Sequence, residues 1–348
     1  MRPGKRQKLL KQRRRAIYHC WNRCVRRALL CGQDPYSGQD YSHRRDWILN
    51  RQEQLAALFA IEIGFHAEMA NHLHLVLRTR PDVARKWSRQ EVARRWLTIT
   101  RLAKCMNDAL PAPDPDKYLE LIKDKKQIRK IRRRLSNVSW FMAILDENIA
   151  RRANAEDECS GRFWQGRYKL RELEGFHSIL LCGIYVDLNP IKAGEAASPQ
   201  TARYTSAYQR IQARAQRPNA RNRADDWLGE LTWQDEAAAD EAVYLSSQTG
   251  KRASDLGWLP ISLEDYLRLL DWTAQQILSG QQSTVPQDLE SILDQLHLNS
   301  EYWLAGVESY ETGFCELVGT PAALSKAARE SGRRCMKGAS ASQQIFTA

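Results

Sequence analysis

The sequence IEIGFHAEMANHLHLVLR, residues 61–78, contains two strand-like runs that only Ala70 and Asn71 separate. Short runs of alternating apolar side chains are typical of strands, and asparagine is common in the tight turns that join antiparallel strands. We therefore predict a β-hairpin with strands over residues 61–69 and 72–78 and with Asn71 at the turn.

The second strand of this hairpin carries the pattern His-hydrophobe-His. Successive side chains of a strand point to opposite faces, so His72 and His74 share one face and the apolar face has Leu73, Leu75 and Leu77. Two imidazoles about 7 Å apart along a strand can bind one divalent metal ion if a third ligand comes from elsewhere. The alternative is a pair of partly buried histidines that only form hydrogen bonds.

The segments around the hairpin alternate between strand-like and helix-like patterns. Apolar side chains at helical spacing predict helices over residues 44–60, 88–106 and 176–189, and strand-like runs occupy residues 16–25 and 162–173. A proline-broken, helical and basic stretch before the last strand has the pattern of an insertion. Without it, the order is β-α-β-β-α-β with an added helix, which is the α+β split βαβ, or ferredoxin-like, arrangement.

The chain of 348 residues is long for a single domain. We predict a basic N-terminal arm (1–15) and a main domain (16–200) with the helical, basic insertion at about 107–150. A basic linker (201–225) then leads to a mostly helical C-terminal region (226–348). No motif in the C-terminal region indicates its role.

The charge of the chain indicates a polyanionic partner. The formal net charge is +12, and one cluster of basic residues lies in the N-terminal arm. A second cluster comprises Lys123, Lys125, Lys126, Arg129, Lys130, Arg132, Arg133 and Arg134. Clustered lysine and arginine neutralise phosphates and release counterions, which gives sequence-independent affinity for nucleic acid. For either cluster alone, a solvated helix face is the alternative.

The sequence lacks the characteristic motifs of several other classes of protein. There is no run of 18 apolar residues, so we expect no membrane span and a cytoplasmic location. The sequence has no Walker A loop, no HExxH and no GxSxG. His66 and Glu68 form an H-x-E without the P-C-x-x-C of a zinc deaminase, and the scattered cysteines predict neither a structural zinc nor disulfides.

A second motif, YVDLNPIKAG, occupies residues 185–194 in the last helix predicted for the main domain. Tyr185 and Asn189 are four residues apart, so their side chains stack on one flank of this helix. Its buried stripe comprises Leu180, Ile184, Leu188 and Ile191. Because proline disfavours helical backbone at the preceding residue, we expect the helix to end at Asn189 and leave that side chain free to reach a ligand. The alternative is a packed tyrosine and a capping asparagine.

Together, NHLHLVL and the downstream YVDLNPIKAG resemble the single-tyrosine transposases of the HUH superfamily, and in particular the REP-associated tyrosine transposases. The superfamily is named for His-hydrophobe-His, which His72 and His74 match. Its nucleophile lies on a late helix in a Tyr-x-x-x-Asn-Pro context, which Tyr185 and Asn189 match. The segment GRFWQGRY at residues 161–168 and the opening 18–27 also resemble the family, and the resemblance covers roughly the main domain.

The resemblance implies an enzyme that cleaves single-stranded DNA and transfers strands, in DNA transposition or in the processing of REP hairpins. His72 and His74 would bind one Mg²⁺ or Mn²⁺, with Asn189 as the third ligand, and the metal would act as a Lewis acid on the phosphate. Tyr185 would attack that phosphate to give a 5′-phosphotyrosine, which a second 3′-OH would then displace. The rival tyrosines, none of which has Asn-Pro at this spacing, are Tyr168, Tyr204 and Tyr208.

Relatives act on folded single strands, so the expected partner is single-stranded or hairpin DNA. We expect phosphate contacts from Arg23, Arg26, Arg27, Arg162, Arg167 and Lys169. Trp164 or Trp21 could stack on an unpaired base, with core packing as the alternative for both. Lys192, about one turn after Asn189, could favour the phenolate of Tyr185, with a solvated lysine as the alternative.

Two other functions are consistent with parts of the sequence. One is a catalytically inactive DNA- or RNA-binding regulator with the same fold, which would need none of His72, His74, Tyr185 and Asn189. The other is a replication-initiator nuclease of the same superfamily, whose usual helicase domain would bring a Walker A loop. The sequence leaves open whether the protein is a monomer or a homodimer.

Overall fold

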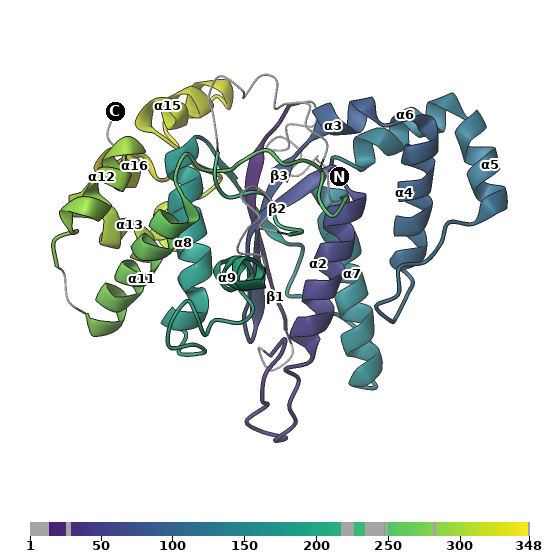
Figure 1. Cartoon of the computed structure of the whole chain (residues 1–348), viewed down its shortest axis with the longest axis horizontal. Helices are drawn as coiled ribbons and strands as arrows, with labels where there is room; N and C mark the ends of the chain where they lie inside the picture. Colours follow the sequence, from purple (N-terminus) through teal and green to yellow (C-terminus); the bar gives the residue numbers. More distant parts are fainter. Residues whose placement is uncertain are drawn as a thin grey trace.

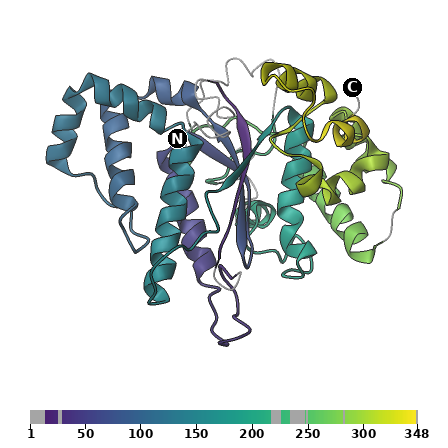
Figure 2. The ribbon, with the colours of Figure 1, turned by 180° about the vertical axis from the view of Figure 1, so that it is seen from behind.

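The computed structural model describes residues 14–25, 29–216, 226–233, 247, 250–280 and 283–346. The fold is α+β, as the sequence predicts, and a mixed sheet stands between two groups of helices (Figures 1 and 2). Most of the predicted N-terminal arm lies outside the described residues. Of the helices in the described ranges, none combines the length and the apolar character that crossing a membrane requires.

Within the described ranges the sheet has five strands, in the order β2-β3-β1-β4-β5. Their bounds are Ile17–Arg23 for β1, Ile61–Glu68 for β2, His72–Thr79 for β3, Lys169–Leu173 for β4 and Leu317–Val318 for β5. The pairs β2-β3, β3-β1 and β1-β4 are antiparallel, and β4-β5 is parallel. The predicted hairpin is therefore confirmed. The predicted strand over 162–173 is too long, because before Lys169 this segment contributes only an isolated bridge, Cys24 to Trp164.

On one face of the sheet lie α2 (Arg44–Leu58) and α7 (Val138–Glu156), with α4 (Arg89–Leu102) outside them (Figure 1). The short helices on this side are α3 (Pro81–Lys86), α5 (Pro115–Lys123) and α6 (Lys125–Arg134). The predicted leucines Leu73, Leu75 and Leu77 are buried in this core together with Phe141 and Leu145 of α7. Although α7 begins inside the predicted insertion, it is therefore part of the main core.

The opposite face is covered by α8 (Phe176–Lys192), which follows β4 directly. Phe65 of β2 lies against Gly183 of α8, where an added Cβ would come within 2.7 Å of the Phe65 ring. Glycine at this position therefore lets α8 approach the sheet closely, two residues before Tyr185.

The remaining helices come from the chain after α8. They are α9 (Ser206–Gln216), α11 (Leu263–Ser279), α12 (Gln287–Gln295), η1 (Ser300–Tyr302), α13 (Trp303–Glu308), α14 (Tyr310–Gly313), α15 (Pro321–Glu330) and α16 (Ala339–Ile345). Of these, α11, α13 and α14 pack directly on α8. A buried ion network also ties this region to the sheet. Glu62 accepts from Arg78 at 2.5 Å and from Arg80 at 3.0 Å, and Arg78 also donates to the carbonyl of Gly257 at 2.6 Å.

The linker predicted over residues 201–225 is corrected by α9. Arg210 of this helix is fully buried and donates to the carbonyls of Gly64 and Gly229 at 2.8 and 2.9 Å. Arg210, which contributes to the basic composition of the predicted linker, therefore donates to backbone carbonyls instead of facing solvent. These bonds fix α9 against the sheet. Residues 217–225 lie outside the described residues.

Candidate active site

The two sequence motifs meet on the face of the sheet that α8 covers. His72 and His74 lie at the start of β3, and Tyr185 lies on α8. The imidazole centroids of His72 and His74 are 4.8 Å apart. The ring of Tyr185 is edge-on to His74, with 5.7 Å between their centroids. Folding thus brings a tyrosine into contact with a histidine pair that is distant from it in the sequence.

Each histidine of the pair has its Nδ1 engaged by a neighbouring side chain. The Nδ1 of His74 lies 2.9 Å from Nε2 of His19 on β1, and the Nδ1 of His72 contacts Oδ1 of Asn71. Within the described part of the chain, Nε2 of His74 is buried and has no hydrogen-bond partner. A buried nitrogen without a partner is uncommon, and metal-binding histidines characteristically use one nitrogen for the metal and the other for a hydrogen bond. His74 therefore fits a metal ion bound through its Nε2.

Burial keeps both imidazoles neutral. It lowers the pKa of His72 to about 4, with a further decrease from Arg23 and an opposing effect of Glu311. The pKa of His74 is held well below its usual range, first by burial and then by the neighbouring histidines and Arg171. A neutral imidazole has the free lone pair that a metal ligand needs.

Asn189 lies one helical turn from Tyr185 as predicted, but the helix does not end there. α8 continues through Pro190 to Lys192. Proline lacks the N–H that would bond the carbonyl of Val186, and Nδ2 of Asn189 donates to that carbonyl at 3.5 Å instead. The same Nδ2 donates to the carbonyl of Tyr185 at 2.9 Å. The side chain is thus fixed to its own helix through nitrogen, and its oxygen is the atom that can serve a cation.

The described residues provide no third histidine, cysteine or carboxylate ligand next to the histidine pair. Among the described residues, no group of three or more histidine, cysteine, aspartate or glutamate side chains is arranged to hold a metal ion. The histidine pair would therefore need an amide oxygen, water or the substrate to complete its coordination. Amide carbonyl oxygens are accepted ligands of hard divalent cations such as Mg²⁺ and Mn²⁺.

The hydroxyl of Tyr185 lies beside a carboxylate from the C-terminal region. It donates to Oε2 of Glu311 at 3.4 Å, and the ring of Tyr310 lies 4.5 Å from the ring of Tyr185. Burial raises the pKa of Tyr185 above its usual range, and Glu311 raises it further, whereas Arg171 lowers it. A phenol in this environment is protonated at pH 7, so it needs a proton acceptor or an added positive charge to act as a nucleophile.

Four residues of this site were not identified from the sequence: His19, Arg171, Tyr310 and Glu311. Alternation along the strand over residues 16–25 places His19 on the same face as Trp21, and this was the available signal for it. Tyr310 and Glu311 belong to α14, where the sequence has no motif. Arg171 donates to four backbone carbonyls at 2.8 to 3.0 Å and so fixes α14 over the site; these belong to Tyr310, Glu311, Phe314 and Cys315.

The residues predicted to contact DNA differ in their exposure and in their distance from the histidine pair. The exposed ones are Arg23, Arg162, Arg167, Lys169 and Lys192. Arg23 ends β1 opposite His72, and Nζ of Lys192 lies 6.0 Å from the ring centroid of Tyr185. These two positive charges therefore lie beside the histidine pair and the tyrosine. Arg26 and Arg27 lie outside the described residues.

The two tryptophans differ in their surroundings. Trp164 is 7% exposed, and its indole N–H donates to the carbonyl of Asp146 at 2.8 Å, so its ring packs in the core. This placement matches the alternative interpretation and leaves no open ring face for a base. Trp21 is half-buried, with Nζ of Lys169 5.8 Å from its ring centroid and the guanidinium carbon of Arg171 at 5.2 Å.

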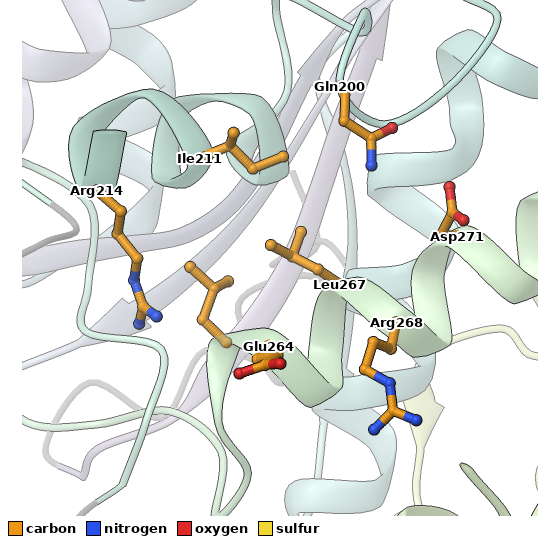
Figure 3. A pocket seen from close by; sticks show the side chains of 8 residues that line it. Gln200, Ile211, Arg214, Glu264, Leu267, Arg268 and Asp271 are labelled. Carbon is orange, nitrogen blue, oxygen red and sulfur yellow. The ribbon is translucent and has the colours of Figure 1, made fainter. Parts of the chain in front are cut away.

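A separate hollow of about 400 Å³ lies between α9 and α11 (Figure 3). Its lining residues are Gln200, Ile211, Arg214, Leu263, Glu264, Leu267, Arg268 and Asp271. Charged side chains of both signs surround apolar ones, and histidine, cysteine and tyrosine are absent from this lining. The lining of the hollow therefore differs in kind from the surroundings of His74 and Tyr185.

Comparisons with family models, with curated proteins and with solved structures find no match for this chain. The function must therefore be inferred from the site itself. Its chemical components are a buried pair of neutral histidines, a tyrosine in contact with one of them, a carboxylate beside the hydroxyl and exposed cations nearby.

Proposed function

We propose that the protein is a metal-dependent nuclease and strand transferase of the HUH single-tyrosine type, acting on single-stranded or hairpin DNA through a 5′-phosphotyrosine. The observation that carries the proposal is the contact of Tyr185 with His74, whose Nε2 is buried without a partner. A protein that only binds nucleic acid needs neither a bare buried imidazole nor a tyrosine against it.

The arrangement of the sheet supports a ferredoxin-like domain. Strands β2, β3, β1 and β4 lie in this order and are antiparallel. α2 connects β1 to β2, and further helices connect β3 to β4, as in the split βαβ arrangement. α8 is then the added helix after the last strand of this unit, the position expected for the nucleophile.

The proposed metal is Mg²⁺ or Mn²⁺, held by Nε2 of His72, Nε2 of His74 and the amide oxygen of Asn189. When bound, the ion would polarise a phosphate oxygen and favour attack at phosphorus. Burial and Glu311 both raise the pKa of Tyr185. The positive charge of a bound ion would lower that pKa and so favour the phenolate.

The reaction exchanges one phosphodiester for another. In cleavage, Oη of Tyr185 forms a bond to phosphorus while the bond from phosphorus to the 3′ oxygen breaks. The phenol proton passes to Glu311, which already accepts its hydrogen bond, and the leaving 3′ oxygen takes a proton from solvent. In strand transfer, the 3′-OH of a second strand attacks the same phosphorus and releases its proton to solvent, and Oη of Tyr185 leaves and takes back the proton held by Glu311.

The same chain supplies every proposed part of this site. Because Tyr185 contacts His74 within one chain, the tyrosine can act in cis, either in a monomer or in each subunit of a homodimer. The partner is proposed from charge: Arg23, Lys169 and Lys192 are exposed around the site and can bind phosphates of an entering strand. Transposition or the processing of REP hairpins would both use this chemistry.

A labelled DNA hairpin with single-stranded flanks tests the proposal. With Mn²⁺ we expect a covalent protein–DNA adduct that survives denaturing electrophoresis, and with EDTA we expect none, because the metal ion is needed at the phosphate. A blunt duplex of the same sequence is the control and should yield no adduct. Binding of the hairpin without adduct in Mg²⁺ or Mn²⁺ would instead support a catalytically inactive DNA- or RNA-binding regulator.

A further inference from the structure

A chain of buried side chains connects the C-terminal region to His74. His19 is 2% exposed and Tyr310 is fully buried. Nε2 of His19 lies 2.9 Å from Nδ1 of His74, and Nδ1 of His19 lies 3.3 Å from the hydroxyl of Tyr310. Neither His19 nor Tyr310 takes part in the cleavage steps proposed above.

If His74 binds a cation, the donor and the acceptor of each hydrogen bond in this series of side chains are fixed. A free lone pair on Nε2 of His74 places its proton on Nδ1, which then donates to Nε2 of His19. The proton of His19 is consequently on Nδ1 and is donated to the hydroxyl oxygen of Tyr310. The hydroxyl of Tyr310 bonds in turn to Cys182: burial raises the pKa of that thiol to about 12, and the hydrogen bond from Tyr310 opposes the rise. Every donor among these side chains, from His74 to Tyr310, thus has an acceptor.

Packing alone does not account for His19. Its ring lies among aromatic rings, with centroids 4.8 Å from Trp21, 6.0 Å from Tyr185 and 5.6 Å from Tyr310. An apolar ring would fill this volume without the cost of burying two polar nitrogens. Both nitrogens of His19 are instead used, one toward His74 and the other toward Tyr310.

We propose that His19 and Tyr310 are positioning residues that hold His74 in the tautomer with Nε2 free for the metal ion. This inference rests on the proposed metal-dependent function and gives the C-terminal region a part in it. Tyr310 belongs to α14, which Arg171 fixes through its bonds to backbone carbonyls. Side chains that orient a metal-binding histidine typically change metal affinity by about 10–100-fold when they are replaced.

The test is the affinity of the full chain for Mn²⁺ without DNA, measured from the electron paramagnetic resonance signal of the free ion. Tyr310→Phe keeps the ring and removes the acceptor for His19, and we expect the Kd to rise about 10-fold. His19→Leu removes both bonds, and we expect a rise toward about 100-fold. His19→Gln has an amide oxygen that can accept from Nδ1 of His74, and we expect it to recover most of the affinity.

Tyr204→Phe is the matched control, because it removes a hydroxyl that bonds to Asp46 at 3.0 Å outside the site. It should bind Mn²⁺ as the wild type does, and thermal unfolding in EDTA shows that each variant is folded. If His19→Leu does not fold, Tyr310→Phe decides the question. Wild-type affinity in folded Tyr310→Phe, with affinity lost in His72→Ala, would overturn the inference and leave the proposed function standing. A wild-type chain that binds no Mn²⁺ would overturn both.

Discussion

Tyr185→Phe is expected to abolish the covalent protein–DNA adduct, with a loss in rate of at least about 10³-fold. The substitution removes the oxygen that would bond to phosphorus. The hydroxyls of the rival tyrosines Tyr168 and Tyr204 are engaged elsewhere, with Ser139 and Asp46 respectively, each at 3.0 Å. The measurement is the amount of labelled hairpin that migrates with the protein on a denaturing gel over time.

The same variant should keep its fold and its affinity for DNA. Phenylalanine retains the ring against His74 and Tyr310, and the lost hydrogen bond to exposed Glu311 is 3.4 Å long. We expect a cost of at most about 1 kcal/mol in the free energy of unfolding. Tyr204→Phe serves as the control and should form the adduct at the wild-type rate. Adduct formation by Tyr185→Phe at a rate near that of the wild type would show that another residue is the nucleophile.

His72→Ala is expected to lose both the binding of Mn²⁺ and the cleavage that Mn²⁺ supports. His72 is half-buried at the edge of the site, so its removal should disturb the core less than removal of His74. Changes in the partners of a metal-binding histidine cost about 10–100-fold in affinity, so loss of the ligand itself should cost more than about 100-fold. Mn²⁺ titration and the adduct assay measure the two effects separately.

His43→Ala is the matched control for this variant. His43 is exposed at the start of α2, where its Nε2 lies 2.5 Å from Glu156, outside the site. We expect this variant to bind Mn²⁺ and to cleave as the wild type does. If His72→Ala still cleaved in a manner stimulated by Mn²⁺, the histidine pair would not be the metal centre.

Much of the fold could be predicted because local patterns determine it. The alternation of side chains over residues 61–78 defines the hairpin, and the side-chain oxygen of Ser88 caps α4 by accepting the N–H of Glu91 at 3.0 Å. The predictions were wrong where side-chain hydrogen bonds to backbone carbonyls override the local pattern. Asn189 replaces the N–H that Pro190 lacks, so α8 continues, and buried Arg210 turns part of the predicted linker into α9.

The candidate site could be predicted only in part, for a similar reason. His72 and His74 share a face because of the strand period, and Tyr185 and Asn189 share a flank because of the helix period. Glu311 and Tyr310 reach the site through the packing of α14, which depends on Arg171, far away in the sequence. The sequence around Glu311 does not indicate which tyrosine this carboxylate contacts in the folded protein.

The most direct measurement is the identification of the residue that carries DNA after cleavage. The adduct formed with a hairpin in Mn²⁺ would be digested with a nuclease and a protease and analysed by tandem mass spectrometry. We predict a nucleotide joined through its 5′-phosphate to Tyr185, and a released strand that ends in a 3′-OH. A nucleotide on any other residue, or cleavage that leaves a free 5′-phosphate and no adduct, would contradict the proposed mechanism.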